Sequence, residues 1–122
     1  MSQQLAEQLA QRVMRKDFEG LRELFHPEID YMGMTPGQFW EGSDPNDVID
    51  IYRDWFEEMD EVVSVELIQT DVVADRERVG YRFIAKNANG NYLVEQQAYL
   101  TELAGKIKWL RVMCTGMRPI PE

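Results

Sequence analysis

The chain has 122 residues, of which 44% are apolar and 29% charged, a composition typical of one folded domain and not of a disordered segment. Its 13 basic and 22 acidic residues give a formal net charge of -9, which argues against nucleic acid or anionic lipid as a partner. No apolar run approaches the roughly 20 residues that a membrane-spanning helix needs.

Two helices are expected in the first part of the chain. Apolar residues recur at every fourth position within Ser2–Met14, which is the spacing of one helix face, and Ser2 can cap this helix. Asp17 is expected to cap a second, shorter helix, which ends at Pro27 because proline cannot continue the helical hydrogen-bond ladder.

A strand, a loop and a third helix follow. The pattern predicts a short strand over Ile29–Met34 and a loop over the Gly- and Pro-containing stretch Met34–Gly42. Asp44 and Pro45 then favour a helix start, since aspartate accepts free backbone N–H groups and proline suits the first helical position. This helix is expected to continue to about Met59.

After Glu61 the apolar period changes from that of a helix to that of a strand. Strands are expected over Val63–Ile68, Arg78–Ala85, Tyr92–Glu102 and Lys106–Met117, separated by short turns. Consecutive hairpins impose antiparallel pairing. Because the helices precede the strands, we expect a single α+β domain over residues 1–122, with three N-terminal helices packed on an antiparallel sheet.

The late strands carry apolar residues on both faces. Those expected on the outer face are Leu93, Tyr99, Ile107, Trp109 and Met113. A sheet covered on one face does not need them, so either a second layer or a partner subunit covers the other face. We favour a homodimer, with Arg82, Arg111 and Trp109 in its interface.

The order of elements, with LRELFHPEIDY leading into a strand and AGKIKWLRV near the end, resembles the nuclear transport factor 2-like superfamily. The SnoaL-like and ketosteroid-isomerase-like branches come closest. The short motifs are Leu24-Phe25-His26-Pro27, Gly105-Lys106-Ile107 and the tail Cys114-Thr115-Gly116-Met117-Arg118-Pro119. This resemblance covers nearly the whole chain and implies a cone-shaped fold, a curved sheet around helices, with a deep apolar pocket and frequent dimerisation through the outer face of the sheet.

Residue by residue, the resemblance supplies no catalytic set. The isomerase-like mechanism needs a carboxylate base after the first strand, a tyrosine on the first helix and an acid on the fourth strand. The matching positions fall near Gly33-Met34, Leu9 and Gln96, so the base and the tyrosine are missing. In the limonene-epoxide-hydrolase branch an acid follows the arginine, but here Val112 follows Arg111. The acid of the polyketide cyclases falls at residues 96–98, so catalytic residues stay unassigned.

Strand alternation and the resemblance together place one set of side chains inside the cone. This set consists of Tyr31, Tyr52, Trp55, Tyr81, Phe83, Gln96, Leu110, Val112 and Cys114. Aromatic rings with two polar anchors, Tyr31 and Gln96, suit a flat apolar ligand. The alternative is an ordinary core whose tyrosines bond to the backbone.

Three titratable residues are candidates for a base. Alternation points Asp30 and Glu95 outward, although a register shift of one residue would bury either of them. His26 is the single histidine and precedes Pro27 at the expected end of the second helix, where it would cap carbonyl groups rather than act as a base.

The single cysteine, Cys114, is expected to be an inert buried thiol, since no histidine lies beside it in the sequence. Neither a metal nor an organic cofactor is expected, because no second Cys or His stands at ligand spacing. One cysteine, together with an N-terminal stretch that lacks a basic leader and an apolar segment, favours a cytoplasmic location.

Two functions stay open. The first is a small-molecule-binding protein, either a binder or a cofactor-free cyclase- or isomerase-like enzyme acting on a polyketide-, steroid- or aromatic-like substrate. The second is a non-catalytic interaction or dimerisation module with a vestigial pocket. The acidic segment Glu41–Glu61, with Arg53 as its one basic residue, is either a solvated helix face or a docking surface for a basic partner.

Overall fold

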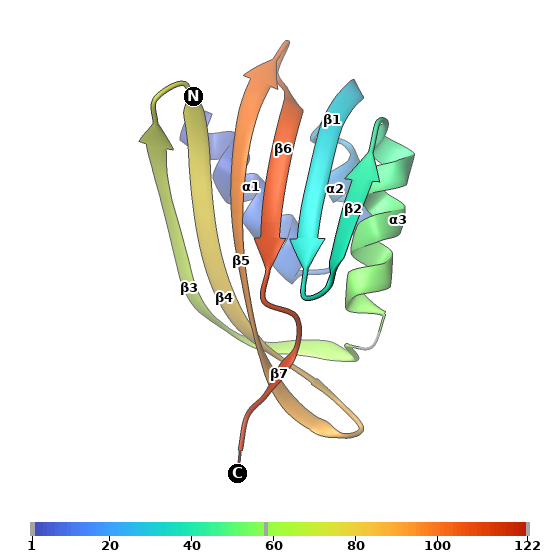
Figure 1. The fold of residues 1–122 in the computed structure, drawn as a ribbon. Helices are drawn as coiled ribbons and strands as arrows, with labels where there is room; N and C mark the ends of the chain where they lie inside the picture. Colours follow the sequence, from blue (N-terminus) through green and yellow to red (C-terminus); the bar gives the residue numbers. More distant parts are fainter. Residues whose placement is uncertain (1, 58, 122) are drawn as a thin grey trace.

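The computed structural model describes residues 2–57 and 59–121, without the side chains of residues 2–4 and 67. The expected cap by the Ser2 side chain therefore lies outside what is described. The elements, in chain order, are α1 (Ser2–Met14), α2 (Phe18–Arg22), β1 (Phe25–Thr35), β2 (Gln38–Gly42), α3 (Pro45–Phe56), β3 (Glu61–Val73), β4 (Arg76–Asn87), β5 (Gly90–Leu103), β6 (Lys106–Cys114) and β7 (Arg118–Pro119) (Figure 1).

The three helices form where the sequence predicts them, but α2 ends earlier. The Asp17 carboxylate accepts a hydrogen bond from the Gly20 N–H at 3.0 Å and caps the start of α2. The helix stops at Arg22, and Pro27 lies inside β1. This position is tolerated because the β1–β6 register shifts between Phe25 and Asp30, so the missing proline N–H breaks no regular ladder.

The stretch expected to be a loop is a β-hairpin. β1 and β2 pair antiparallel and are joined by the two-residue turn Pro36-Gly37, with Gly37 at φ +80°. Proline followed by a residue with positive φ is the preferred sequence of a type II turn. The Trp40 indole N–H donates to the Thr35 hydroxyl at 2.8 Å across this hairpin.

α3 begins as expected and ends three residues early. Asp44 accepts the Asp47 N–H at 2.9 Å, and Pro45 occupies the first helical position. The helix ends at Phe56 instead of Met59. Its buried face, which includes Tyr52 and Phe56, packs on the sheet and places aromatic rings inside the fold.

The sheet is mixed, not antiparallel throughout. Its strands lie in the order β2-β1-β6-β5-β4-β3, and β7 pairs with β5. All pairs are antiparallel except β1 with β6, which is parallel. The meander brings its last long strand back beside the first strand, and both run in the same direction. Figure 1 shows the helices on one side of the sheet and the ends of β3, β4 and β5 curving beneath α3, so the α+β architecture with a curved sheet is confirmed.

Period-two alternation sets the inner and outer faces of the long strands. On β4, Val79, Tyr81 and Phe83 are buried, whereas the residues between them are half-buried. Ile107 was expected on the outer face but is buried, because a register shift between Thr101 and Glu102 turns it inward. The strand expected to reach Met117 ends at Cys114, and the chain then pairs again with β5 as β7.

Candidate functional site

Three aromatic residues meet on the inner side of the sheet. Tyr31 comes from β1, and Tyr52 and Trp55 from neighbouring turns of α3. Their ring centroids are 6.0 Å apart for Tyr31 and Tyr52, 6.5 Å for Tyr31 and Trp55, and 5.1 Å for Tyr52 and Trp55. Their tilted and edge-on arrangement is the one that aromatic pairs favour. We call these three residues the donor cluster.

Among the described residues, the polar atoms of the donor cluster lack a well-formed hydrogen bond to the protein. Within the described residues, the hydroxyls of Tyr31 and Tyr52 and the indole Nε1 of Trp55 are buried without a hydrogen bond of acceptable geometry. Burial raises the pKa values of both phenols, and a contact between the two hydroxyls, outside good hydrogen-bond geometry, raises that of Tyr31 further and opposes the rise at Tyr52. Buried polar atoms are nearly always hydrogen-bonded, and each unsatisfied one costs about 1–3 kcal/mol. Three such atoms on neighbouring rings therefore distinguish this part of the interior from an ordinary apolar core.

A second polar group lies beside the donor cluster. The Tyr81 hydroxyl donates to Gln96 Oε1, and Gln96 Nε2 donates to the Cys114 Sγ at 3.3 Å. The backbone N–H of Gly116 also donates to the same sulfur, at 3.4 Å. These bonds fix the Gln96 amide, which is only 3% exposed, with its oxygen toward Tyr81 and its nitrogen toward Cys114.

Burial determines the protonation state of the tyrosine and cysteine side chains in this interior. Desolvation raises the pKa values of Tyr31, Tyr52 and Tyr81 well above the ordinary value of 10.0. Burial likewise raises the pKa of the Cys114 thiol, although the hydrogen bonds from Gln96 and Gly116 oppose the shift. All four groups are therefore protonated at neutral pH, and the phenols are hydrogen-bond donors.

The nine residues expected inside the cone all lie on its inner side. Seven are buried, while Trp55 and Cys114 are half-buried. Phe83, Leu110 and Val112 form apolar wall, and Phe83 packs on the Phe56 ring with centroids 5.8 Å apart. That these side chains form a ligand pocket stays a prediction.

Gly33 is a site residue that the sequence analysis did not select. A Cβ at this position would lie 2.8 Å from Trp55 Cη2 and 2.8 Å from the Tyr31 hydroxyl. The absent side chain is what allows these two groups to meet at one point. The sequence signal that could have identified Gly33 is its position two residues after Tyr31, which places both residues on the same face of the strand.

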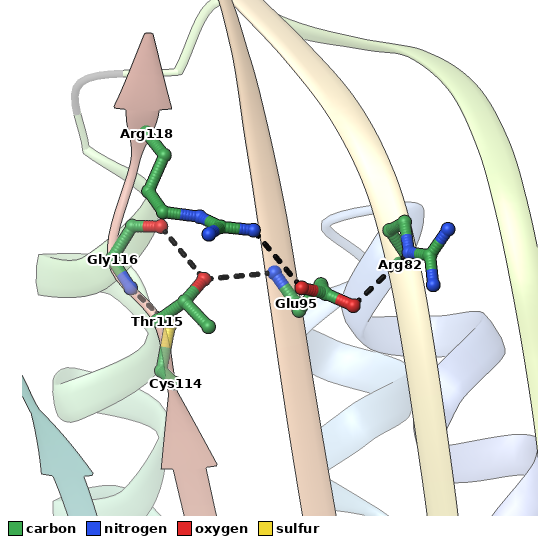
Figure 2. Close-up of polar contacts among 6 residues, drawn as sticks. All are labelled: Arg82, Glu95, Cys114, Thr115, Gly116 and Arg118. Atoms are coloured by element: carbon green, nitrogen blue, oxygen red, sulfur yellow. Dashed lines mark hydrogen bonds and ion pairs between the residues drawn. The ribbon is translucent and has the colours of Figure 1, made fainter.

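The candidate bases lie outside the donor cluster. Asp30 is exposed and paired with Arg111 at 3.2 Å. Glu95 lies on the outer face between Arg82 and Arg118, each 3.0 Å away. Figure 2 shows this carboxylate bridging the two arginines beside the Cys114–Gly116 segment. The outward orientation expected of both acids is therefore confirmed.

His26 does not cap a helix, contrary to expectation. It lies within β1, and its Nδ1 accepts the Glu28 N–H at 3.0 Å. The buried acid is instead Glu77, which is 4% exposed and accepts the Ala6 N–H of α1 at 3.3 Å. Glu77 falls between the strands expected at Val63–Ile68 and Arg78–Ala85, and its burial was not predicted because only the packing of α1 on β4 covers it.

The described residues contain no group of three or more His, Cys, Asp or Glu side chains placed to hold a metal ion. Nor does any described helix have the length and apolar character required to cross a membrane. The absence of a cofactor and the cytoplasmic location stay predictions.

A family model described as the SnoaL-like domain matches residues 3–104. The chain belongs to the SnoaL-like domain family. None of the curated proteins compared with this SnoaL-like chain matches it. The fold is also that of the ketosteroid-isomerase-like proteins, a group of structures that includes proteins provisionally assigned as isomerases and polyketide cyclases.

Three solved structures illustrate the likeness of this SnoaL-like domain. A protein with a ketosteroid isomerase-like fold from Catenulispora acidiphila, in complex with trimethylamine, aligns with TM-score 0.71 and 10% identity over 92% of this chain and 85% of that one. A Bacillus subtilis protein provisionally assigned as an isomerase aligns with TM-score 0.70 and 13% identity, over 93% and 87%. A Sinorhizobium meliloti protein provisionally assigned as a polyketide cyclase gives 0.64 and 14%, over 89% and 93%. At these identities the likeness establishes the fold alone.

Proposed function

We propose that the interior of this SnoaL-like domain binds a small, flat, largely apolar molecule that carries an acceptor oxygen. The observation that carries the proposal is the donor cluster, with its three buried polar atoms that lack a partner among the described residues. An indole N–H can only donate, so the group that suits Trp55 is an acceptor. Tyr31 and Tyr52, which stay protonated, can donate to the same oxygen.

The surrounding side chains favour a ligand that is apolar apart from this oxygen. Leu110 lies beside Tyr31 and Val112 beside Gly33 on the neighbouring strand, and the Gln96 amide, bonded to Tyr81, is the other buried polar group. Apolar walls with a few converging polar groups are the usual composition of small-molecule sites. We infer a polyketide-, steroid- or aromatic-like ketone as the ligand class, and the S. meliloti protein of the same fold is provisionally assigned as a polyketide cyclase.

The chemistry that the donor cluster can perform is polarisation of a carbonyl group. Neutral donors aimed at a carbonyl oxygen stabilise the negative charge that an enolate would carry. Among the described residues, no carboxylate or imidazole joins the cluster, because Asp30 and Glu95 point outward and His26 is on the surface side of β1. The proposed function is therefore binding, with any isomerase- or cyclase-like step limited to what polarisation alone can assist.

Binding of 1-tetralone, compared with tetralin, tests the proposal. Both are flat bicyclic molecules, but only the ketone carries an acceptor oxygen. We expect 1-tetralone to bind more strongly by about 1–3 kcal/mol, because it supplies a partner for buried donors. Isothermal titration calorimetry measures both affinities, and 1-tetralone at 100 times its dissociation constant should raise the free energy of unfolding by about 2.7 kcal/mol.

Equal affinities for the two molecules would contradict the acceptor-oxygen proposal. If neither molecule binds or stabilises the protein, the interior is an ordinary core, and the non-catalytic interaction module becomes the better interpretation.

We also propose that two copies associate through the outer face of the sheet. A hollow of about 200 Å³ on this face is lined mainly by apolar side chains from β1, β2, β5 and β6, which include Met32, Met34, Phe39, Tyr99 and Met113. Phe39 is 71% exposed and Met113 is 55% exposed in the single chain. Nearby, the guanidinium groups of Arg76 and Arg111 lie 4.4 and 4.7 Å from the centre of the Trp109 ring. Burial of such an apolar patch favours association.

Met113→Glu should convert this dimer to a monomer. Two-fold symmetry would bring two carboxylates into one apolar contact, where neither is solvated or paired. Sedimentation velocity measures the change in mass. Val72→Glu is the matched control, because Val72 is 54% exposed on β3, at the opposite edge of the sheet. A wild-type protein that sediments as a monomer would refute the interface.

A further inference from the structure

The chain beyond β6 forms a strap across the seam between two parts of the sheet. β6 pairs with β5 as far as Cys114 opposite Gln96, and β7 pairs with β5 again at Leu93 and Tyr92. The intervening residues bend at Gly116, whose φ is +77°. Figure 1 shows this segment leaving β6 and crossing toward the curved ends of β4 and β5. We call residues 115–119 the strap.

The strap joins β5 to the β1–β2 hairpin. On the β5 side, the Thr115 N–H donates to the Glu95 carbonyl at 3.0 Å, and the Glu95 N–H donates to the Thr115 hydroxyl at 3.1 Å. Arg118 is paired with the Glu95 carboxylate at 3.0 Å (Figure 2). On the other side, the backbone of Gly116 is so close to the Pro36 ring that an added Cβ would lie 3.2 Å from it.

The strap is also held by the two-residue β7–β5 pairing and, just beyond it, by the bond from the Ile120 N–H to the Asn91 carbonyl at 3.0 Å. The ion pair among its attachments is exposed. The Arg118 side chain is 53% exposed and the Glu95 side chain 38% exposed. Exposed ion pairs contribute little stability, so they hold a segment without locking it. Local segments held in this way open far more often than the whole protein unfolds.

The strap is bonded directly to the polar groups of the interior. The Gly116 N–H donates to the Cys114 sulfur, which also accepts from Gln96, and Gln96 accepts from Tyr81. Met117 is partly buried and packs on the core. A groove of about 430 Å³ runs beside this seam on the outer face of the sheet, where its lining includes Arg78, Arg82, Glu95, Met113 and Thr115, together with Cys114. The groove therefore reaches Cys114 and Thr115 from the outer face, while Tyr81 and Gln96, whose side chains point inward, are only 2% and 3% exposed.

We propose that the strap is the gate through which small molecules reach the interior of the cone. Detachment of Thr115 and Arg118 from Glu95, together with loss of the two-residue β7–β5 pairing, frees Gly116 from the Cys114 sulfur and opens the seam between β5 and the β1–β2 hairpin. The identity of the molecule that enters rests on the function proposed above, whereas the gate itself does not.

Alkylation of Cys114 by iodoacetamide measures the opening, because this is the one cysteine in the chain. Arg118→Ala should accelerate the reaction about two- to five-fold at constant pH, which is the range expected for loss of an exposed ion pair. Arg82→Ala is the matched control. It removes the other arginine from the same Glu95 carboxylate, also at 3.0 Å, and leaves the strap attached. We expect Arg82→Ala to leave the rate unchanged. Thr115→Val, which removes the acceptor of the Glu95 N–H, should act as Arg118→Ala does.

Equal rates for Arg118→Ala and the wild type, or equal acceleration by Arg118→Ala and Arg82→Ala, would overturn the gate. So would an acceleration no larger than the change in the unfolding equilibrium measured in urea, since the thiol would then react through global unfolding. Association of 1-tetralone should accelerate in parallel with alkylation, and a tetralone association rate that Arg118→Ala does not change would also overturn the gate. If 1-tetralone binds no variant, the function proposed above fails, and the alkylation rates still decide the gate.

Discussion

Tyr52→Phe should raise the free energy of unfolding by about 1–3 kcal/mol, and Tyr31→Phe should do the same. Each substitution removes a buried hydroxyl that has no partner among the described residues and keeps the ring that packs on its neighbours. Chemical denaturation in the absence of ligand measures the change. The two effects should not be additive, because the hydroxyls influence each other.

The same substitutions should remove the preference for an acceptor oxygen. With one donor gone, 1-tetralone loses affinity relative to tetralin, while the apolar contacts of both molecules persist. A gain in stability accompanied by a loss of ligand selectivity distinguishes a binding group from a packing group.

Tyr81→Phe is the control for these two variants, with the opposite expected sign. The Tyr81 hydroxyl is as buried as the others but donates to Gln96, so its removal should lower the free energy of unfolding by about 1 kcal/mol. If Tyr52→Phe destabilises the protein as Tyr81→Phe does, the Tyr52 hydroxyl has a partner and the argument for the binding site fails.

The inner and outer faces of the long strands could be predicted because alternation leaves only two choices of face for each strand. Tyr81 and Gln96 lie opposite each other on neighbouring strands, and both face inward as the pattern indicates. The outward orientation of Glu95 follows from the same alternation. Ile107 breaks the rule because a register shift in the β5–β6 pair adds a residue, and local sequence carries no clear mark of that shift.

The first strands were harder to predict because long-range pairing decides them. β1 extends back through Pro27 since β6, some 80 residues later in the chain, pairs with it in parallel. The β1–β2 hairpin had a local signal in Pro36-Gly37, but the short β2 has too few residues for its alternation to stand out.

Only part of the candidate site could be predicted from the sequence. The sequence places Tyr31, Tyr52 and Trp55 inside, but which of their polar atoms lack partners depends on distances between β1 and α3 that no local pattern contains. Gly33 matters because a side chain there would occupy the point where Tyr31 and Trp55 meet. Glu77 looks like a turn residue until α1 is packed over it.

Glu77 should make the protein less stable as the pH rises from about 4.5 to about 7. Burial raises the pKa of this carboxyl from its ordinary value of 4.5 to about 7, against the opposing hydrogen bond from the Ala6 N–H, and nearby Glu102 adds to the rise. The folded protein therefore binds the proton more tightly than the unfolded chain does. The contribution of Glu77 to the free energy of unfolding is fully present below pH 4.5 and is lost as the pH rises through 7. The total loss is about 2–3 kcal/mol.

Glu77→Gln should abolish this dependence, since an amide keeps an oxygen for the Ala6 N–H and carries no charge at any pH. The difference in unfolding free energy between Glu77→Gln and the wild type isolates the titration of Glu77 from that of the chain's 21 other acids. That difference should be small at pH 4, grow through pH 5 to 7 and level off near 2–3 kcal/mol in favour of Glu77→Gln at pH 8.

Glu102→Gln is the matched control, because it keeps Glu77 and removes the neighbouring charge, so the transition should move to lower pH. A difference that stays flat from pH 4 to 8 would mean that Glu77 titrates as an ordinary exposed carboxyl, and that the first turns of α1 do not cover it in solution.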